Sequence, residues 1–394
     1  MNRSFSDRIS KLQPSTIREM LKASSDPETV PFAAGNPSTE CFPVQEMAQL
    51  SAELFAKSAP SALQYGITEG FPLLRELTAD RLRKRHNTGS ATDSLIITSG
   101  GQQGIELAAK VLCNEQDTVL CEAPSFIGAL NAFRSYNLHL AGVPADSCGM
   151  DIDALEQALK TEKNVKMIYT IPTFQNPTGA TLPLERRRRM LELSARYNVM
   201  ILEDSPYLEL RYSGSEVQTI KSLDTEGRVI YVGSYSKIIA PGIRVGFVCA
   251  PEDITAKMTV AKQVSDVHTN LFFQMLVASF IERYDLDAHI ARCAALYRGK
   301  RDILAGALRS RMGDKLEMTV PEGGLFLWAS LKGVANSIPF CQKAKERKAM
   351  VVPGVTFNPD ESVPSNGFRL NFSLPTPEQL TRGASLLGDA MDAL

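Results

Sequence analysis

The sequence predicts an α/β fold, in which a mostly parallel sheet lies between two layers of helices. Between residues 94 and 250, short runs rich in β-branched residues alternate with amphipathic stretches of helical period. Beyond residue 251 the apolar residues recur mainly at helical spacing, and a mixture of strands and helices follows. The chain has 394 residues, more than a single hydrophobic core usually serves, so we expect a large and a small domain.

The expected strands of the large domain are short apolar runs, and the helices between them are amphipathic. The strands lie at 94–98, 117–121, 165–171, 199–203, 228–234 and 245–250. The helices lie at 102–113, 125–136, 151–161 and 183–197. Because parallel strands bring their carboxyl ends to one edge of the sheet, ligand-binding side chains should gather there.

Four consecutive arginines, residues 186–189, lie inside the last of these helices. Such a run occurs in nucleic-acid-binding and localisation segments. Here Leu184, Met190 and Tyr197 are among the apolar residues that alternate with the charges at helical spacing. We therefore expect a solvated helix face with a structural role.

The last third of the chain predicts a small α+β domain. Long helices are expected at roughly 251–264, 271–283 and 285–311, followed by a strand at 325–331, a helix at 336–347, strands near 349–352 and 367–373, and a terminal helix from 376. We place the large domain at 45–290 and the small domain at 1–44 and 291–394. The sequence has no internal repeat, low-complexity tract or long linker, so the two domains should form one rigid unit.

Composition narrows the class of partner. The 43 Lys and Arg residues nearly balance the 44 Asp and Glu residues, which argues against nucleic acid and anionic membranes as partners. The seven cysteines are scattered singly, without the C-x-x-C pair typical of metal or redox sites, so neither a disulfide framework nor a metal site is expected. No signal-peptide core or membrane-spanning apolar run is present, and we expect a soluble cytoplasmic protein that acts on small molecules.

The densest group of chemically active residues follows the strand at 228–234. Lys237 would lie at the carboxyl end of that strand, with Ser234, Ser236 and Arg244 nearby. Hydroxyl donors and a guanidinium group match the oxygens of a phosphate dianion. An amine beside a phosphate site suggests a phosphorylated aldehyde as ligand, although the segment alone also fits an ordinary lysine that caps a strand.

Two further segments follow predicted strands. Asn176 lies in Asn-Pro-Thr-Gly, which many proteins use only to reverse the chain. Asp204 comes directly after the apolar strand 199–203 and would be partly buried, a position that requires a partner. A protonated pyridine nitrogen is one candidate partner for Asp204, and a helix N-cap is the alternative role.

The segment 98–104, Thr-Ser-Gly-Gly-Gln-Gln-Gly, joins the first strand to a helix. Glycines at a helix N-terminus present free N–H groups and the positive end of the helix dipole, which suits a phosphate. The segment matches neither a Walker loop nor G-x-G-x-x-G, so nucleotide binding gains no support. A plain strand-to-helix turn is the alternative.

Taken in order, SGGQQ, NPTG, EDSPY and SYSKIIAPGIRVG resemble the signature of fold-type I pyridoxal-phosphate enzymes, specifically the class I/II aminotransferases. The resemblance extends over essentially the whole chain and implies a seven-stranded sheet in the large domain. It is strongest to the branch of 2-aminoadipate aminotransferases and kynurenine aminotransferase II. The motifs that carry this likeness are STIRE at 15–19, FAAGNPS at 32–38, LQYGITEG at 63–70 and FRLNFS at 368–373.

The resemblance implies a role for each catalytic residue. Lys237 would carry pyridoxal 5′-phosphate through its amine and later move a proton between the substrate α-carbon and the cofactor. Asp204 would hold the pyridine nitrogen protonated, while Asn176 and Tyr207 would hydrogen-bond the 3′-oxygen. Phe126 matches the residue that stacks on the ring, although many relatives carry tyrosine there. The implied phosphate ligands are Gly101, Gln102, Ser234, Ser236, Arg244 and Tyr65 of a neighbouring subunit.

The substrate would be held by residues from three parts of the chain. Arg369 matches the arginine that grips the substrate α-carboxylate, with Asn176 beside it and Gly35 allowing close approach of the backbone. Arg18 matches a position that receives the distal end of the substrate in the aminoadipate-like branch, although a helix-surface arginine fits the sequence equally well. Because Tyr65 would come from a second subunit, the resemblance implies a homodimer.

The implied reaction is transfer of an amino group from an L-amino acid to a 2-oxo acid by a ping-pong cycle. The donor would be 2-aminoadipate, an aromatic or a branched-chain amino acid, with 2-oxoglutarate as acceptor. A β-lyase, racemase, decarboxylase or biosynthetic cyclase would use the same carbanion chemistry, and sequence separates these poorly. A non-enzymatic transcription regulator of similar fold is the third hypothesis, disfavoured by the absence of room for a DNA-binding region.

Overall fold

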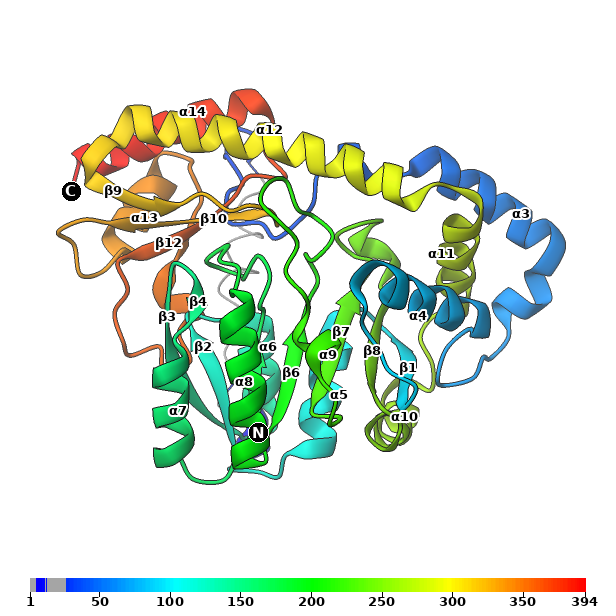
Figure 1. The fold of residues 1–394 in the computed structure, drawn as a ribbon. Helices are drawn as coiled ribbons and strands as arrows, with labels where there is room; N and C mark the ends of the chain where they lie inside the picture. Colours follow the sequence, from blue (N-terminus) through cyan, green and yellow to red (C-terminus); the bar gives the residue numbers. More distant parts are fainter. Residues whose placement is uncertain (1–4, 11, 13–25) are drawn as a thin grey trace.

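The computed structural model describes residues 5–10, 12 and 26–394, and a large sheet covered by helices forms its lower part (Figure 1). The strand order in this sheet is β1-β8-β7-β6-β5-β2-β3-β4. Strands β3, β2, β5, β6 and β7 run parallel to one another, whereas β8, β1 and β4 pair antiparallel with their neighbours. The strands are β1 (Asp93–Thr98), β2 (Thr118–Ala123), β3 (His139–Asp146), β4 (Gly149–Met150), β5 (Val165–Thr170), β6 (Met200–Asp204), β7 (Val229–Ser234) and β8 (Gly246–Pro251).

This arrangement confirms the predicted α/β fold and adds one strand to the seven expected. The extra strand, β4, has two residues and lies at the sheet edge. Strand β3 was absent from the strands read directly off the sequence, because it lies near that edge and its residues are mostly half-buried or exposed. The central strands β5, β6 and β7 are buried almost throughout, which explains their continuous apolar sequence.

Helices cover both faces of the sheet, each with its own hydrophobic core. On one face α5 (Gly101–Leu112), α6 (Ile127–Ser135) and α10 (Glu252–Asp266) share a core with the strands. On the other face a second core is shared by the strands and the helices α7 (Ile152–Thr161), α8 (Leu184–Tyr197) and α9 (Ile220–Leu223). The two layers leave the carboxyl ends of the parallel strands free to carry a site.

The expectation that residues 186–189 form a solvated helix face is wrong for Arg187. Its side chain is buried and donates to the carbonyl oxygens of Leu182 (2.8 Å), Gln218 (2.9 Å) and Pro172 (2.6 Å). Carbonyl groups of two loops surround this side chain, and a planar guanidinium can donate to several of them at once. Arg187 thus anchors the loop that follows β5.

Replacing Arg187 with Met should therefore lower the free energy of unfolding by about 3 kcal/mol, because buried carbonyl groups lose their donor. Arg189→Met is the matched control, since Arg189 forms partly exposed ion pairs with Glu192 and Glu156. Arg189→Met should lower the free energy of unfolding by less than about 1 kcal/mol. Urea unfolding of both variants measures the difference, and equal losses would contradict the structural role of Arg187.

Helices α3 (Val44–Leu63), α4 (Pro72–His86) and α11 (Leu271–Arg283) pack together at one end of the molecule (Figure 1). From there α12 (Leu286–Met312) runs across the top to the small domain. One hydrophobic core joins all four helices to the small domain, as expected for a single rigid unit. Helices α3 and α4 were not among the elements predicted from the sequence.

The small domain contains a four-stranded antiparallel sheet in the order β11-β12-β10-β9. Its strands are β9 (Leu316–Thr319), β10 (Phe326–Leu331), β11 (Val352–Pro353) and β12 (Gly367–Asn371), and its helices are α13 (Ile338–Glu346) and α14 (Pro377–Asp392). Shorter helical segments are α1 (Asp7–Ser10), η1 (Thr39–Cys41), η2 (Pro241–Ile243), η3 (Gly313–Lys315) and η4 (Gly354–Phe357). The edge strand β9 was not predicted.

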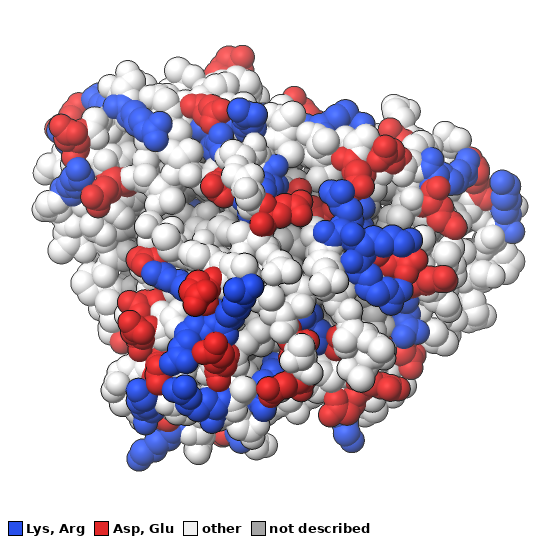
Figure 2. Space-filling model, in the orientation of Figure 1, with Lys and Arg blue, Asp and Glu red and all other residues white. Residues whose placement is uncertain are grey.

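Acidic and basic side chains are interspersed on the face of the molecule shown in Figure 2. Among the described residues, no helix is both long and apolar enough to cross a membrane.

Candidate active site

A cavity of about 850 Å³ lies at the carboxyl ends of β6 and β7, with the small domain on its other side. It brings together every predicted site residue except Tyr65 and Arg18. Those lining residues are Gly35, Gly101, Gln102, Phe126, Asn176, Asp204, Tyr207, Ser234, Ser236, Lys237, Arg244 and Arg369. Phe326, Ile171 and Asn131 also line the cavity and were not predicted.

Lys237 lies in the turn after β7, and its Nζ donates to the carbonyl oxygen of Gly35 at 2.8 Å. Burial, with Arg369 and Arg244 nearby, lowers the pKa of Lys237 from 10.5 to about 8. An amine with this pKa is partly neutral near physiological pH and is therefore nucleophilic. The alternative of a simple strand-capping lysine does not explain its place in the cavity.

The lowered pKa of Lys237 predicts its reactivity. Only the neutral amine attacks trinitrobenzenesulfonate, so labelling of Lys237 in the cofactor-free protein should rise as the pH increases through about 8. Arg244→Gln removes a nearby cation and should shift the midpoint to higher pH. Peptide mapping measures the labelling, and a midpoint that is unchanged in the variant would contradict this account.

Asp204 is the last residue of β6 and is 3% exposed. Burial raises its pKa to about 7, although the Tyr169 hydroxyl donates to its Oδ2 at 2.8 Å and lowers the pKa. No described cation forms an ion pair with Asp204, so the carboxylate is available to a cationic group in the cavity. Tyr169 was missed because a tyrosine within a buried strand looks like an ordinary core residue.

Arg369 on β12 is 2% exposed, and no described acidic residue forms an ion pair with it. Its Nη1 donates to Asn176 Oδ1 at 3.0 Å and its Nη2 to the Ala33 carbonyl at 2.8 Å, while its Nε has no partner. The guanidinium lies 4.1 Å from the centre of the Phe326 ring. Burial lowers its pKa to about 10. A buried guanidinium without a counter-ion is suited to an anionic ligand.

Several hydrogen-bond donors line the cavity where α5 begins. The N-terminus of α5, at Gly101, faces Ser234 and Arg244 across the cavity. Arg244 Nη2 donates to the Ser99 carbonyl at 3.0 Å, and a Cβ on Gly100 would collide with this guanidinium. Gly100 has φ +80°, a conformation that glycine adopts without strain. Helix N–H groups, hydroxyls and a guanidinium thus converge on one corner.

These residues fit pyridoxal 5′-phosphate. The corner at Gly101 suits the phosphate, and the buried Asp204 carboxylate suits a protonated ring nitrogen. Phe126, at the start of α6, provides an aromatic face on the cavity wall. Lys237 provides a partly neutral amine for the aldehyde. One cavity thus provides a corner for the phosphate, a carboxylate for the ring nitrogen, an aromatic face for the ring and an amine for the aldehyde.

Tyr65 does not line this cavity. Its side chain is 79% exposed and makes an edge-to-face contact with His268 at 5.7 Å. Leu63 and Ile67, beside it in the chain, are 72% and 52% exposed. The prediction that Tyr65 serves a neighbouring subunit stays a prediction, and Arg18 lies outside the described residues.

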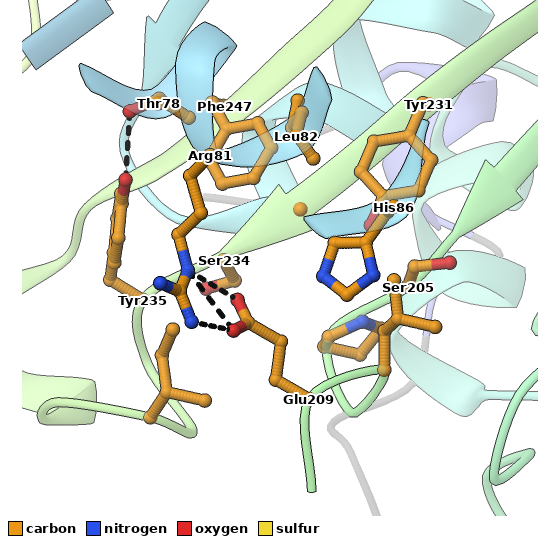
Figure 3. A pocket seen from close by; sticks show the side chains of 14 residues that line it. Thr78, Arg81, Leu82, His86, Ser205, Glu209, Tyr231, Ser234, Tyr235 and Phe247 are labelled. Carbon is orange, nitrogen blue, oxygen red and sulfur yellow. Dashed lines mark hydrogen bonds and ion pairs between the residues drawn. The ribbon is translucent and has the colours of Figure 1, made fainter. Parts of the chain in front are cut away.

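A second, much smaller cavity of about 20 Å³ lies behind Ser234 and Pro206, which also line the main cavity (Figure 3). His86 and Ser205 line it, and the His86 Nε2 and Ser205 Oγ are buried without hydrogen-bond partners. Arg81 and Glu209 also line it and form an ion pair (Figure 3). The space is sufficient for one water molecule but not for a substrate.

Comparison with known proteins decides the family. A family model described as aminotransferase class I and II matches residues 27–387. The chain is a class I and II aminotransferase. This aminotransferase depends on pyridoxal phosphate, and the predicted family, enzyme class and cofactor are confirmed.

The relatives of the aminotransferase share nearly its whole length. It is 39% identical to aromatic-amino-acid aminotransferase 1 of Thermococcus litoralis, over 98% of this chain and 94% of the relative. It is 35% identical to 2-aminoadipate transaminase of Thermus thermophilus, over 99% of this chain and 97% of the relative. The crystal structure of Pyrococcus horikoshii kynurenine aminotransferase matches with a TM-score of 0.95 and 37% sequence identity. The match covers 99% of this chain and 97% of the kynurenine aminotransferase chain. The aminotransferase thus belongs to a group whose members differ in substrate.

Proposed function

We propose that this aminotransferase moves the amino group of an L-amino acid to a 2-oxo acid such as 2-oxoglutarate by a ping-pong mechanism. The donor is an aromatic, 2-aminoadipate or branched-chain amino acid, the first two being the substrates named for relatives at 39% and 35% identity. The observation that carries the proposal is Arg369, a buried guanidinium that has no counter-ion among the described residues and lines the same cavity as Lys237.

Arg369 binds the α-carboxylate that every amino acid and 2-oxo acid substrate carries. Its planar guanidinium offers parallel N–H groups to the two carboxylate oxygens, and its orphaned Nε is one of the groups that gains an acceptor. The hydrogen bond to Asn176 and the rings of Phe326 and Phe357 hold the guanidinium in place. Orientation of the carboxylate directs the substrate α-carbon toward Lys237.

Asp204, Asn176 and Tyr207 hold the ring of the cofactor. The Asp204 carboxylate keeps the ring nitrogen protonated, and its burial strengthens that interaction. Asn176 and Tyr207, which line the cavity, would donate to the 3′-oxygen, and Phe126 would provide the aromatic face for the ring. Gly101, Gln102, Ser234, Ser236 and Arg244 hold the phosphate. When bound, pyridoxal phosphate supplies a conjugated ring that accepts the electron pair left at the substrate α-carbon.

Lys237 moves the proton. In its neutral form, Nζ would accept the proton of the substrate α-carbon and, once protonated, would give that proton up again. The hydrogen bond to the Gly35 carbonyl positions Nζ before substrate arrives, and Gly35 leaves room for the substrate beside it. Burial, together with the nearby guanidinium groups of Arg369 and Arg244, lowers the pKa of Lys237 and keeps the lysine partly neutral.

A homodimer completes the proposed site. Leu63, Tyr65 and Ile67 form an exposed apolar segment next to α3, where Phe55 is 49% exposed. A second copy of the chain would cover this segment and bring Tyr65 to the partner's phosphate-binding corner. Arg18, outside the described residues, is proposed to meet the distal end of the substrate.

A donor screen with the cofactor-loaded enzyme tests the function. The cofactor absorbance should change on adding an aromatic amino acid or 2-aminoadipate and return on adding 2-oxoglutarate, with glutamate as product. Initial rates should follow ping-pong kinetics. Release of pyruvate with ammonia, of carbon dioxide, or of the D-enantiomer would instead indicate a β-lyase, a decarboxylase or a racemase.

A further inference from the structure

A fully buried lysine lies beneath the loop that begins α5. Lys262, on α10, has its Nζ 2.8 Å from Asp266 Oδ1, 2.8 Å from Gln103 Oε1 and 2.9 Å from Thr269 Oγ1. An ammonium group has three N–H donors, and burial is costly unless they are paired. Each donor has its own acceptor, so the geometry of this group is closely defined.

Asp266 and Gln103 connect the buried lysine to Ser99, the residue before the two glycines of the loop. Asp266 Oδ2 accepts from Ser99 Oγ at 2.9 Å and from Gln103 Nε2 at 2.8 Å. Gln103 Oε1 accepts from the Ser99 backbone N–H at 2.8 Å. On its other side, the Ser99 carbonyl accepts from Arg244 at 3.0 Å. Ser99 is therefore held from both sides.

The turn that follows Asp266 is held in an unfavourable backbone conformation. Val267 has φ +64° and ψ −60°, which a β-branched residue rarely adopts. The His268 N–H donates to the Asp266 carbonyl at 2.7 Å across this turn, and Lys262 holds Thr269 at its end. Such a conformation persists only where surrounding contacts impose it. The network is thus strong enough to determine local backbone geometry.

We infer that Lys262, Asp266 and Gln103 are positioning residues for the phosphate-binding loop 99–102. Gly100, with φ +80°, makes the turn into α5 conformationally permissive, so the N–H groups of Gly101 and Gln102 are aimed at a phosphate only if contacts outside the turn fix it. The network supplies those contacts through Ser99. The inference rests on the proposed role of Gly101 and Gln102 as phosphate ligands.

The alternative role for Lys262 is that of an ordinary buried ion pair, which would stabilise the fold without affecting ligand binding. A matched pair elsewhere in the chain separates the two roles. Lys221 is also buried, and its Nζ lies 2.7 Å from Asp93 Oδ1 and 3.2 Å from Asp224 Oδ2. Lys221 makes no contact with the loop or the main cavity.

The test compares Lys262→Met with Lys221→Met. Thermal unfolding of the cofactor-free proteins reports stability, and equilibrium dialysis reports the Kd for pyridoxal 5′-phosphate and for pyridoxal, which lacks the phosphate. Both variants should unfold at lower temperature. Only Lys262→Met should weaken pyridoxal-phosphate binding, by about 10-fold, while its affinity for pyridoxal stays within about twofold of wild type.

Equal pyridoxal-phosphate affinity in wild type and Lys262→Met would overturn the inference, as would an equal loss for both ligands. Ser99→Ala, which removes the hydrogen bonds of the Ser99 hydroxyl to Asp266 and Thr269 without leaving a buried charge unpaired, provides a milder variant if Lys262→Met does not fold. Ser99→Ala should weaken the binding of pyridoxal phosphate by about threefold and leave the affinity for pyridoxal unchanged. A wild-type protein with no preference for the phosphorylated ligand would instead refute the proposed phosphate ligands themselves.

Discussion

Lys237→Ala should lower kcat by about 10⁴-fold or more, because it removes the amine that we propose binds the cofactor aldehyde and moves the substrate proton. Lys237 is the lysine that lines the main cavity, so no other described lysine can take over this role. Single-turnover absorbance measurements with an aromatic amino acid check the result. The cofactor-loaded variant should bind substrate yet fail to complete the amino-group transfer.

Lys237→Arg is the control for charge. A guanidinium stays protonated at any pH that the protein survives, whereas the pKa of Lys237 is lowered to about 8. The variant should therefore be as inactive as Lys237→Ala, which would show that a neutral amine, and not a cation, is needed. Wild-type turnover by Lys237→Ala would refute the assignment of this residue.

Arg369→Leu should reduce kcat/KM by about 10³-fold for amino acids and for 2-oxo acids alike, because both lose the guanidinium that we propose binds the α-carboxylate. The loss should appear mostly as a higher KM, since the carboxylate carries the same charge throughout the reaction. Steady-state kinetics with both substrates measure it. The leucine preserves apolar contact with the ring of Phe326, which lies beneath the guanidinium.

Arg211→Leu provides a matched comparison. The Arg211 guanidinium also lies over an aromatic ring, that of Phe174 at 4.7 Å, but it is paired with Glu322 and does not line the main cavity. Its replacement should leave KM for both substrates close to the wild-type value. An unchanged KM in Arg369→Leu would mean that another group binds the α-carboxylate.

The buried part of the fold was predictable from the sequence. Strands such as β6 and β7 are apolar along their whole length because both faces are covered, and that pattern is visible without the structure. Strand β3, next to the edge of the large sheet, and the edge strand β9 were missed because partial exposure gives them a mixed composition. Arg187 was assigned to the surface because arginine seldom lies in a core unless carbonyl groups converge on it.

By itself, the sequence determined the α/β class, the family and the cofactor. Their signals are local: a lysine, an aspartate or a glycine turn follows directly after a recognisable strand, and parallel topology brings strand ends together. Each segment could be interpreted where it stands in the chain.

Only the tertiary structure decided which distant groups act together. The contact of Arg369 with Asn176, the donation of Tyr169 to Asp204 and the network from Lys262 to Ser99 join residues far apart in the chain. No local pattern encodes such contacts, because they depend on how the small domain and α10 pack against the sheet. For the same reason, whether a side chain such as Lys262 is buried and paired, and so available to position a ligand loop, followed from packing alone.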